Sequence, residues 1–223
     1  MNRPLSKREL TTLLIIPLEL LIGWLLSLTD LIKLPVAGPL LVFCIFFLGF
    51  LAAILLNRTF LKNSWQQYKE KLFRNFMLSV LFAVIFGVIQ QVGRGLVQPA
   101  SIHGNLLTMT ILPTLIGALI PMMAPFTEEL VFRHILFFKW TTSKTMTILM
   151  LFVSSILFGL AHFNNFQGQL IYTLPLMAGG FLFALFYYWK KNIWFSLMAH
   201  FIYNVAFSFI PAVVILFFQL FTN

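Results

Sequence analysis

Three short polar motifs at helical spacing stand out in a chain that is otherwise strongly apolar. In chain order they are Glu128-Glu129-x-x-x-Arg133, Phe158-x-x-x-His162 and His200-x-x-x-Asn204. Ionisable side chains are costly in hydrocarbon, so those that remain usually face the interior of a helix bundle and carry function. Two glutamates, two histidines and an asparagine can deprotonate a water and stabilise an oxyanion. The motifs therefore predict a hydrolytic site within a membrane.

The composition indicates the kind of protein that holds these motifs. Of 223 residues, 60% are hydrophobic and only 9% are charged, and the mean hydropathy is +0.94. A soluble domain would carry roughly 25% charged residues. We predict an all-α fold, a polytopic membrane bundle of seven to eight transmembrane helices. It would form one domain over residues 1–223, with a motif-bearing core at about 104–210.

The basic residues fall between the apolar runs and account for the net charge of +9. They form four groups: Arg3, Lys7 and Arg8; Arg58, Lys62, Lys69, Lys71 and Arg74; Lys139 and Lys144; Lys190 and Lys191. Lys and Arg concentrate in cytoplasmic loops, so we predict a cytoplasmic N-terminus and external loops near 30–33, 98–104 and 163–168. Anionic lipid is then the expected partner of this charge, and nucleic acid is not.

Prolines and a polar loop suggest where the helices break. Proline kinks a helix, so we expect a break near Pro121–Pro125, with Thr127 capping a new helix that begins at Glu128. Pro211 is expected to leave a short last helix at about 212–221. The mixture of basic and aromatic residues at 57–75 suggests an interfacial amphipathic helix. With Cys44 as the only cysteine, an internal disulfide and a Cys-based metal site are excluded.

The first motif separates two adjacent carboxylates. Neighbouring residues on a helix diverge by about 100°, so Glu128 and Glu129 are not expected to point at one substrate. Glu129 and Arg133 are four residues apart, which favours an ion pair. We therefore expect a structural pair, Glu129–Arg133, and a free Glu128 that faces a polar cavity as a general base. A solvated helix just beyond a membrane span is the alternative.

The two histidines differ in their setting. His162 closes a helix, where a capping or interface role is a common alternative. His200 and Asn204 share one helix face and can both donate hydrogen bonds, as an oxyanion hole requires, although they would also suit an interhelical polar contact. Counting from the nearest cytoplasmic lysine at 1.5 Å per residue places Glu128 about 17 Å deep, His200 about 13 Å and His162 near 27 Å. Helix tilt, or a turn at Lys144 that re-enters the membrane late, would narrow this gap, and without either the three residues do not form one site.

The ordered motifs resemble the CPBP family of CAAX-protease and bacteriocin-processing intramembrane peptidases, also described as Abi or CAAX prenyl protease-like. The resemblance covers about residues 125–204. It implies that Glu128 and His162 activate the attacking water, whereas His200 and Asn204 stabilise the oxyanion. Glu129 and Arg133 would be structural support. The family has also been described as metallopeptidases, so zinc bound by two His and one Glu is the alternative to a cofactor-free mechanism. His134 departs from the pattern, because many members have Gly there.

These observations predict an intramembrane endopeptidase that cleaves a peptide or protein presented at the membrane, for example a CAAX-type tail, a leader peptide or a bacteriocin-like substrate. The alternatives are a non-catalytic bacteriocin-immunity or membrane scaffold protein, and a small transporter that uses Glu19, Glu128 and Arg94. Glu19 lies in the middle of the first apolar run and is expected either to pair with Arg94 or to line the cavity. We expect an integral protein of a bacterial plasma membrane. The sequence leaves its oligomeric state open.

Overall fold

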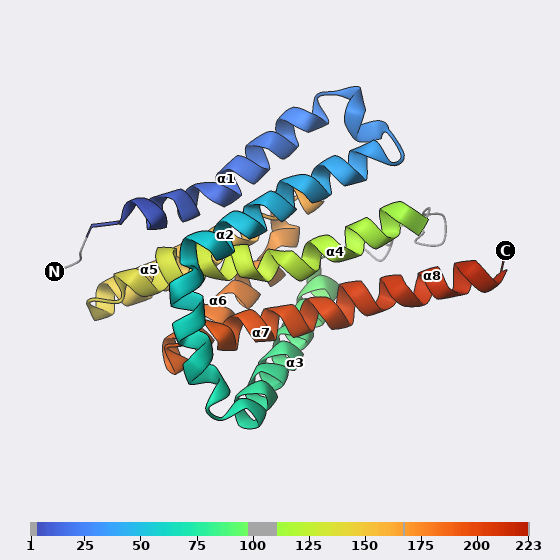
Figure 1. The fold of residues 1–223 in the computed structure, drawn as a ribbon. Coiled ribbons are helices and arrows are strands. Elements are labelled where there is room, and N and C mark those ends of the chain that lie inside the picture. The colour runs from blue at the N-terminus through green and yellow to red at the C-terminus, as the bar shows by residue number, and fades with distance from the viewer. Residues whose placement is uncertain (1–3, 98–110, 167, 223) are drawn as a thin grey trace.

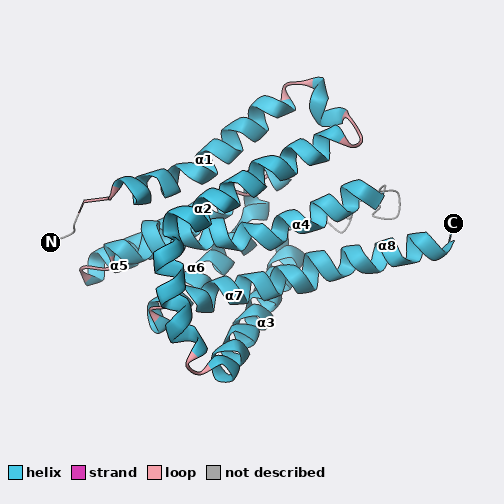
Figure 2. Cartoon of the chain, viewed as in Figure 1, coloured by secondary structure: helices cyan, strands magenta, loops and turns pink. Residues whose placement is uncertain are grey.

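The protein is helical throughout the part of the chain that the structure describes. This computed structural model describes residues 4–97, 111–166 and 168–222, and all regular elements in these ranges are helices (Figure 2). The predicted all-α fold is confirmed. Arg3, the loop at 98–104 and residues 104–110 of the predicted core lie outside the described residues.

The described residues form eight α-helices and several short 3-10 or π segments (Figure 1). The α-helices are α1 (Lys7–Ser27), α2 (Ala37–Lys69), α3 (Leu72–Val97), α4 (Ile111–Glu128), α5 (Lys144–Leu160), α6 (Leu174–Lys190), α7 (Ile193–Asn204) and α8 (Ile210–Thr222). The 3-10 segments are η1 (Asp30–Lys33), η5 (Phe138–Trp140), η6 (Phe163–Phe166) and η7 (Leu170–Thr173). Two π-helices, η4 (Glu129–Phe137) and η8 (Val205–Phe209), continue α4 and α7 directly.

Six helical stretches of the described chain are long and apolar enough to cross a membrane. They are Lys7–Ser27, Ala37–Lys69, Leu72–Val97, Pro113–Trp140, Leu170–Lys190 and Ile193–Gln219. Helix α5 is apolar but has only 17 residues, below the length of a usual span. The polytopic helical bundle is confirmed, whereas the predicted count of seven to eight spans is not. Large apolar side chains stay exposed along the outside of these helices, as expected for surfaces that face lipid.

Pro211 does not break the last span, contrary to the prediction. Helices α7 and α8 run on in one line in Figure 1, joined by the π-helix η8. The Ile210 N–H donates to the Val205 carbonyl, five residues back, which closes a π turn. This turn is wider than an α turn and accommodates Pro211, the next residue. The single span Ile193–Gln219 thereby replaces two predicted helices.

The predicted break near Pro121–Pro125 is also absent, and Thr127 caps no new helix. Helix α4 continues to Glu128 with both prolines inside it. Pro125 lacks the N–H that would bond to the Pro121 carbonyl, but the side-chain Nδ2 of Asn204 donates to that carbonyl at 2.7 Å. A partner from another helix therefore satisfies the free carbonyl, and the span stays continuous.

Most of the polar stretch at 57–75 continues helix α2 and forms no separate helix. Helix α2 runs unbroken to Lys69, and its last part bends away from the axis of the first (Figure 1). Side chains after α6 hold it in place, because Asn192 Nδ2 donates to the Ser64 carbonyl and Trp194 Nε1 to the Leu61 carbonyl. Two predicted cytoplasmic loops therefore lie at the same end of the bundle.

Glycines permit the close helix packing that brings the motifs together. A Cβ atom at Gly179 of α6 would overlap the Phe86 ring of α3, and one at Gly180 would crowd the Phe158 ring of α5. Small residues let neighbouring membrane helices approach closely. Phe86 and Phe158 both pack against the His200 ring. The glycines of α6 therefore set the spacing of the helices that carry the polar residues.

Candidate active site

The two glutamates of the first motif lie at the change from α-helix to π-helix. Glu128 ends α4 and Glu129 begins η4, where Phe138 N–H closes the π turn on the Arg133 carbonyl. A π turn contains more residues than an α turn, so successive side chains diverge by less. Segments of this kind are frequent at functional sites. The local winding therefore brings the two carboxylates closer in direction than an α-helix would.

The Glu129 carboxylate is fully buried and contacts two partners. Its Oε2 lies 3.5 Å from Arg133 Nε, and both side chains have 0% exposure. Its Oε1 lies 3.1 Å from His200 Nδ1. Sequence reasoning predicted the ion pair with Arg133 but missed the contact with His200. Glu129 is therefore placed to orient a second motif as well as to neutralise Arg133.

Arg133 is enclosed by aromatic rings. Its guanidinium carbon lies 4.0 Å from the centre of the Phe158 ring and 5.7 Å from those of Phe132 and Phe183. Its three side-chain nitrogens make no hydrogen bond within the described structure, so its compensation comes from the Glu129 charge and from cation–π contact. The Phe of the second motif thus has a physical role, because it covers the buried cation of the first.

Phe158 also fixes His162. The His162 ring lies 5.1 Å from the Phe158 ring, and His162 Nδ1 lies 2.9 Å from the Phe158 carbonyl oxygen. A carbonyl only accepts hydrogen bonds, so Nδ1 carries a proton, and Nε2 is the nitrogen that is unprotonated when the ring is neutral. That Nε2 faces Glu128 Oε1 at 3.6 Å.

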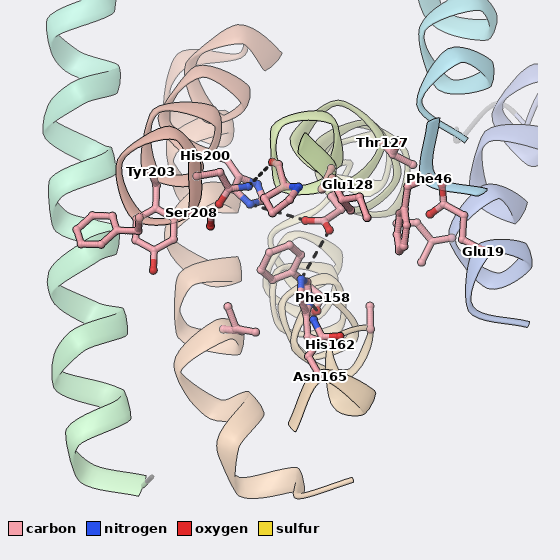
Figure 3. Close-up of a pocket in the computed structure, with 18 of the residues that line it drawn as sticks. Glu19, Phe46, Thr127, Glu128, Phe158, His162, Asn165, His200, Tyr203 and Ser208 are labelled. Atoms are coloured by element: carbon pink, nitrogen blue, oxygen red, sulfur yellow. Dashed lines mark hydrogen bonds and ion pairs between the residues drawn. The ribbon is translucent and has the colours of Figure 1, made fainter. Parts of the chain in front are cut away.

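Glu128 lies between the two histidines at the wall of a cavity (Figure 3). Its Oε2 is 3.8 Å from His200 Nε2, and its side chain is 15% exposed. The cavity has a volume of about 490 Å³ and is lined by residues of α1, α2, α3, α4, α5, α6 and α7 and of the segments η6 and η8. Glu128, His162, His200 and Asn204 all line it, so the structure brings together the four residues expected to do chemistry.

The expected divergence of the two glutamates is only partly correct. Glu128 and Glu129 contact the same imidazole, from its Nε2 and Nδ1 sides respectively. Glu128 borders the cavity while Glu129 is sealed from it. The carboxylates therefore differ in exposure, as predicted, but share His200, which was not predicted.

One of the two amide hydrogens of Asn204 makes a structural hydrogen bond to another helix. The hydrogen bond from Nδ2 to the Pro121 carbonyl uses one N–H, and an asparagine amide has two. The second N–H remains available at the cavity wall. The sequence signal for this contact was the pair Pro121 and Pro125 at a spacing of four, which leaves one carbonyl without its helical donor.

Glu128, His162 and His200 are of the types that bind catalytic zinc, since two His and one Glu form a known ligand set. Catalytic zinc is bound by three side chains at about 2.0–2.2 Å from one point. Among the described residues, no group of three His, Cys, Asp or Glu side chains is placed to hold a metal ion.

The comparison with family models gives the same assignment as the motifs. Residues 109–206 match the family described as type II CAAX prenyl endopeptidase Rce1-like. The CPBP resemblance is thereby confirmed for this segment, and the chain is an integral membrane protein. No curated protein and no solved structure gives a significant match.

The buried pair Glu129–Arg133 yields a prediction about stability. E129Q or R133M alone leaves an uncompensated buried charge, so each should lower the free energy of unfolding by about 3–5 kcal/mol. The double variant E129Q/R133M removes both charges of the pair. Its free energy of unfolding should therefore fall by much less than the sum of the two single losses. Unfolding of the purified protein in detergent measures all four forms. Additive losses would show that the two side chains do not stabilise one another.

Proposed function

We propose that this protein hydrolyses a peptide bond of a membrane-presented peptide or protein with a water held by Glu128 and His162. The observation that carries the proposal is the facing pair of acceptors, Glu128 Oε1 and His162 Nε2, at 3.6 Å. This separation is too long for a direct hydrogen bond, and it suits two acceptors that bind one water between them. A water in that position would donate one hydrogen to each acceptor and keep its lone pairs free.

His200 and Asn204 are proposed to stabilise the charge that develops on the carbonyl oxygen. A histidine donates from both ring nitrogens only as an imidazolium, and this is the form that we propose for His200. Since His200 Nδ1–H faces Glu129, the imidazolium donates from Nε2. The second N–H of Asn204 Nδ2 adds another donor, as in other oxyanion holes.

In the proposed reaction Glu128 acts first as a base and then as an acid. Glu128 takes one proton from the water while the water oxygen attacks the carbonyl carbon. The resulting oxyanion accepts hydrogen bonds from His200 and Asn204. Collapse of this intermediate breaks the carbon–nitrogen bond, and the protonated Glu128 gives its proton to the leaving amine. The second proton of the water stays on the new carboxylic acid, which releases it to solvent as the product leaves. The other product is an amine, and the enzyme returns to its starting state.

The site also suggests how substrate is presented. A cavity of about 490 Å³ holds a short extended segment and not a folded domain. Lys139 Nζ lies 2.7 Å from Glu9 Oε2, so the N-terminal end of α1 lies beside the 139–144 turn. This supports the proposal that both face the cytoplasm of a bacterial plasma membrane, with the positive-inside pattern as its basis. CAAX-type tails, leader peptides and bacteriocin-like peptides are the proposed substrate classes.

Replacing Glu128 tests the proposal. E128Q keeps the size and hydrogen-bonding capacity of the side chain but removes the base, so the rate should fall by about 10²–10⁴-fold. Peptides released by cells that express the wild type are compared by mass spectrometry with those from an E128Q strain at matched expression. E70Q is the matched control, because Glu70 is an exposed carboxylate outside the cavity.

A peptide that is released by wild type and E70Q, and is lost in E128Q, supports proteolysis and identifies the substrate. Identical peptide profiles in all three strains, in the native host and under conditions where the protein acts, would contradict the proposal and favour a binding role.

A chelator separates the two mechanisms. The glutamate mechanism predicts that the purified protein in liposomes keeps its rate of substrate cleavage after treatment with 1,10-phenanthroline. The non-chelating isomer 1,7-phenanthroline controls for effects of the compound on the bilayer. Loss of activity with the chelator alone, reversed by added zinc, would establish the metallopeptidase alternative instead.

A further inference from the structure

A second carboxylate lines the cavity, on a helix that carries none of the motifs. Glu19 of α1 is 8% exposed and lines the same cavity as Glu128. Its Oε1 has no hydrogen-bond partner. Of the two expectations for Glu19, lining the cavity is confirmed and pairing with Arg94 is not, because the described residues include no ion pair between them, although Arg94 also lines the cavity. The carboxylate is thus more than nine-tenths buried and without an opposite charge.

The neighbouring helix leaves room for this side chain. A Cβ atom at Gly49 of α2 would overlap the Glu19 carboxylate, so any other residue at this position would displace it. Figure 3 shows Glu19 and Phe46 together at the end of the cavity wall that α1 and α2 form. Glu19 therefore occupies a site that both helices shape, and it is not a side chain directed at lipid.

Glu19 is also separate from the family's catalytic segment. The family match covers residues 109–206, and α1 ends at Ser27. The motifs thus account for the chemistry without Glu19. An ionisable residue inside a membrane span is retained at a cost, and it usually pairs with another charge or lies on a substrate path. Among the described residues Glu19 forms no ion pair, so a cationic group on the occupant of the cavity would give the carboxylate a direct partner.

The surroundings of Glu19 indicate the shape of that occupant. Ile16, Leu20 and Phe46 line the cavity beside it and offer an apolar wall. Lysine and arginine side chains have apolar stems and charged tips, so they bury methylene groups while placing the charge at a polar site. An acidic group would be repelled by both Glu19 and Glu128. A basic side chain would pack its methylene groups against the apolar wall and place its charge beside the unpaired carboxylate.

We propose that Glu19 selects substrates by binding the cationic tip of a lysine or arginine side chain close to the scissile bond. This inference rests on the proposed peptidase function and adds a specificity determinant to it. The ion pair would form only when substrate occupies the cavity, so it supplies binding energy for the correct substrate. A buried charge pair of this kind is sensitive to removal of either partner.

The test uses purified protein in liposomes and a library of internally quenched peptides. Members of each set are identical except at one position, which holds Lys, its uncharged analogue norleucine, or Glu, and that position is moved along the peptide. At the position that reaches Glu19, wild type should cleave the Lys peptide about tenfold or more faster than the norleucine peptide. E19Q should reduce this ratio to near one, and E19K should favour the Glu peptide.

E9Q provides the matched control. Glu9 is also a carboxylate of α1, but it pairs with Lys139 outside the cavity, so E9Q should keep the wild-type ratio. Equal rates for Lys and norleucine peptides at every position, or a preference that survives in E19Q, would overturn the inference and leave the peptidase proposal intact.

Binding to the E128Q protein separates failure of the two proposals. Fluorescence anisotropy with the same labelled peptides requires no cleavage. If no peptide is cut by wild type, the peptidase proposal fails on this library. The inference then holds only if E128Q binds a Lys peptide about tenfold more tightly than its norleucine analogue and E19Q/E128Q does not. Equal binding of the two peptides to E128Q would overturn it.

Discussion

The arrangement of the site depends on the buried carboxylate of Glu129. It has no exposed surface and contacts both Arg133 and His200, and a buried charge without partners is strongly destabilising. Arg133 in turn packs on Phe158, whose carbonyl oxygen orients His162. One buried ion pair therefore links all three motifs. Glu128 is the acid of the cluster that remains open to the cavity.

The sequence was sufficient to predict the fold class and the residues of the cluster, because hydrophobic runs and helical spacing are local properties. It failed at the prolines, since the consequence of Pro125 depends on a side chain far away in the chain. Asn204 supplies the donor that the Pro121 carbonyl lacks, and the helix continues. A contact between α4 and α7 cannot be read from either segment alone.

The depth estimate failed for a related reason. It placed His162 about 10 Å beyond Glu128 by counting backbone rise alone. Side chains on a helix lean toward its N-terminus, so on these antiparallel segments Glu128 leans away from the 139–144 turn while His162 leans back toward it. The bond from His162 Nδ1 to the Phe158 carbonyl keeps the ring in that direction. The two side chains thereby reach a separation of 3.6 Å.

The most direct test of the central claim is the origin of the oxygen in the product of a single turnover. With excess enzyme in water enriched in oxygen-18, attack by a water held between Glu128 and His162 predicts one heavy oxygen in the new carboxylate and none in the enzyme. An unlabelled product together with a heavy oxygen in the Glu128 side chain would show that Glu128 itself attacks the peptide bond, and would contradict the account.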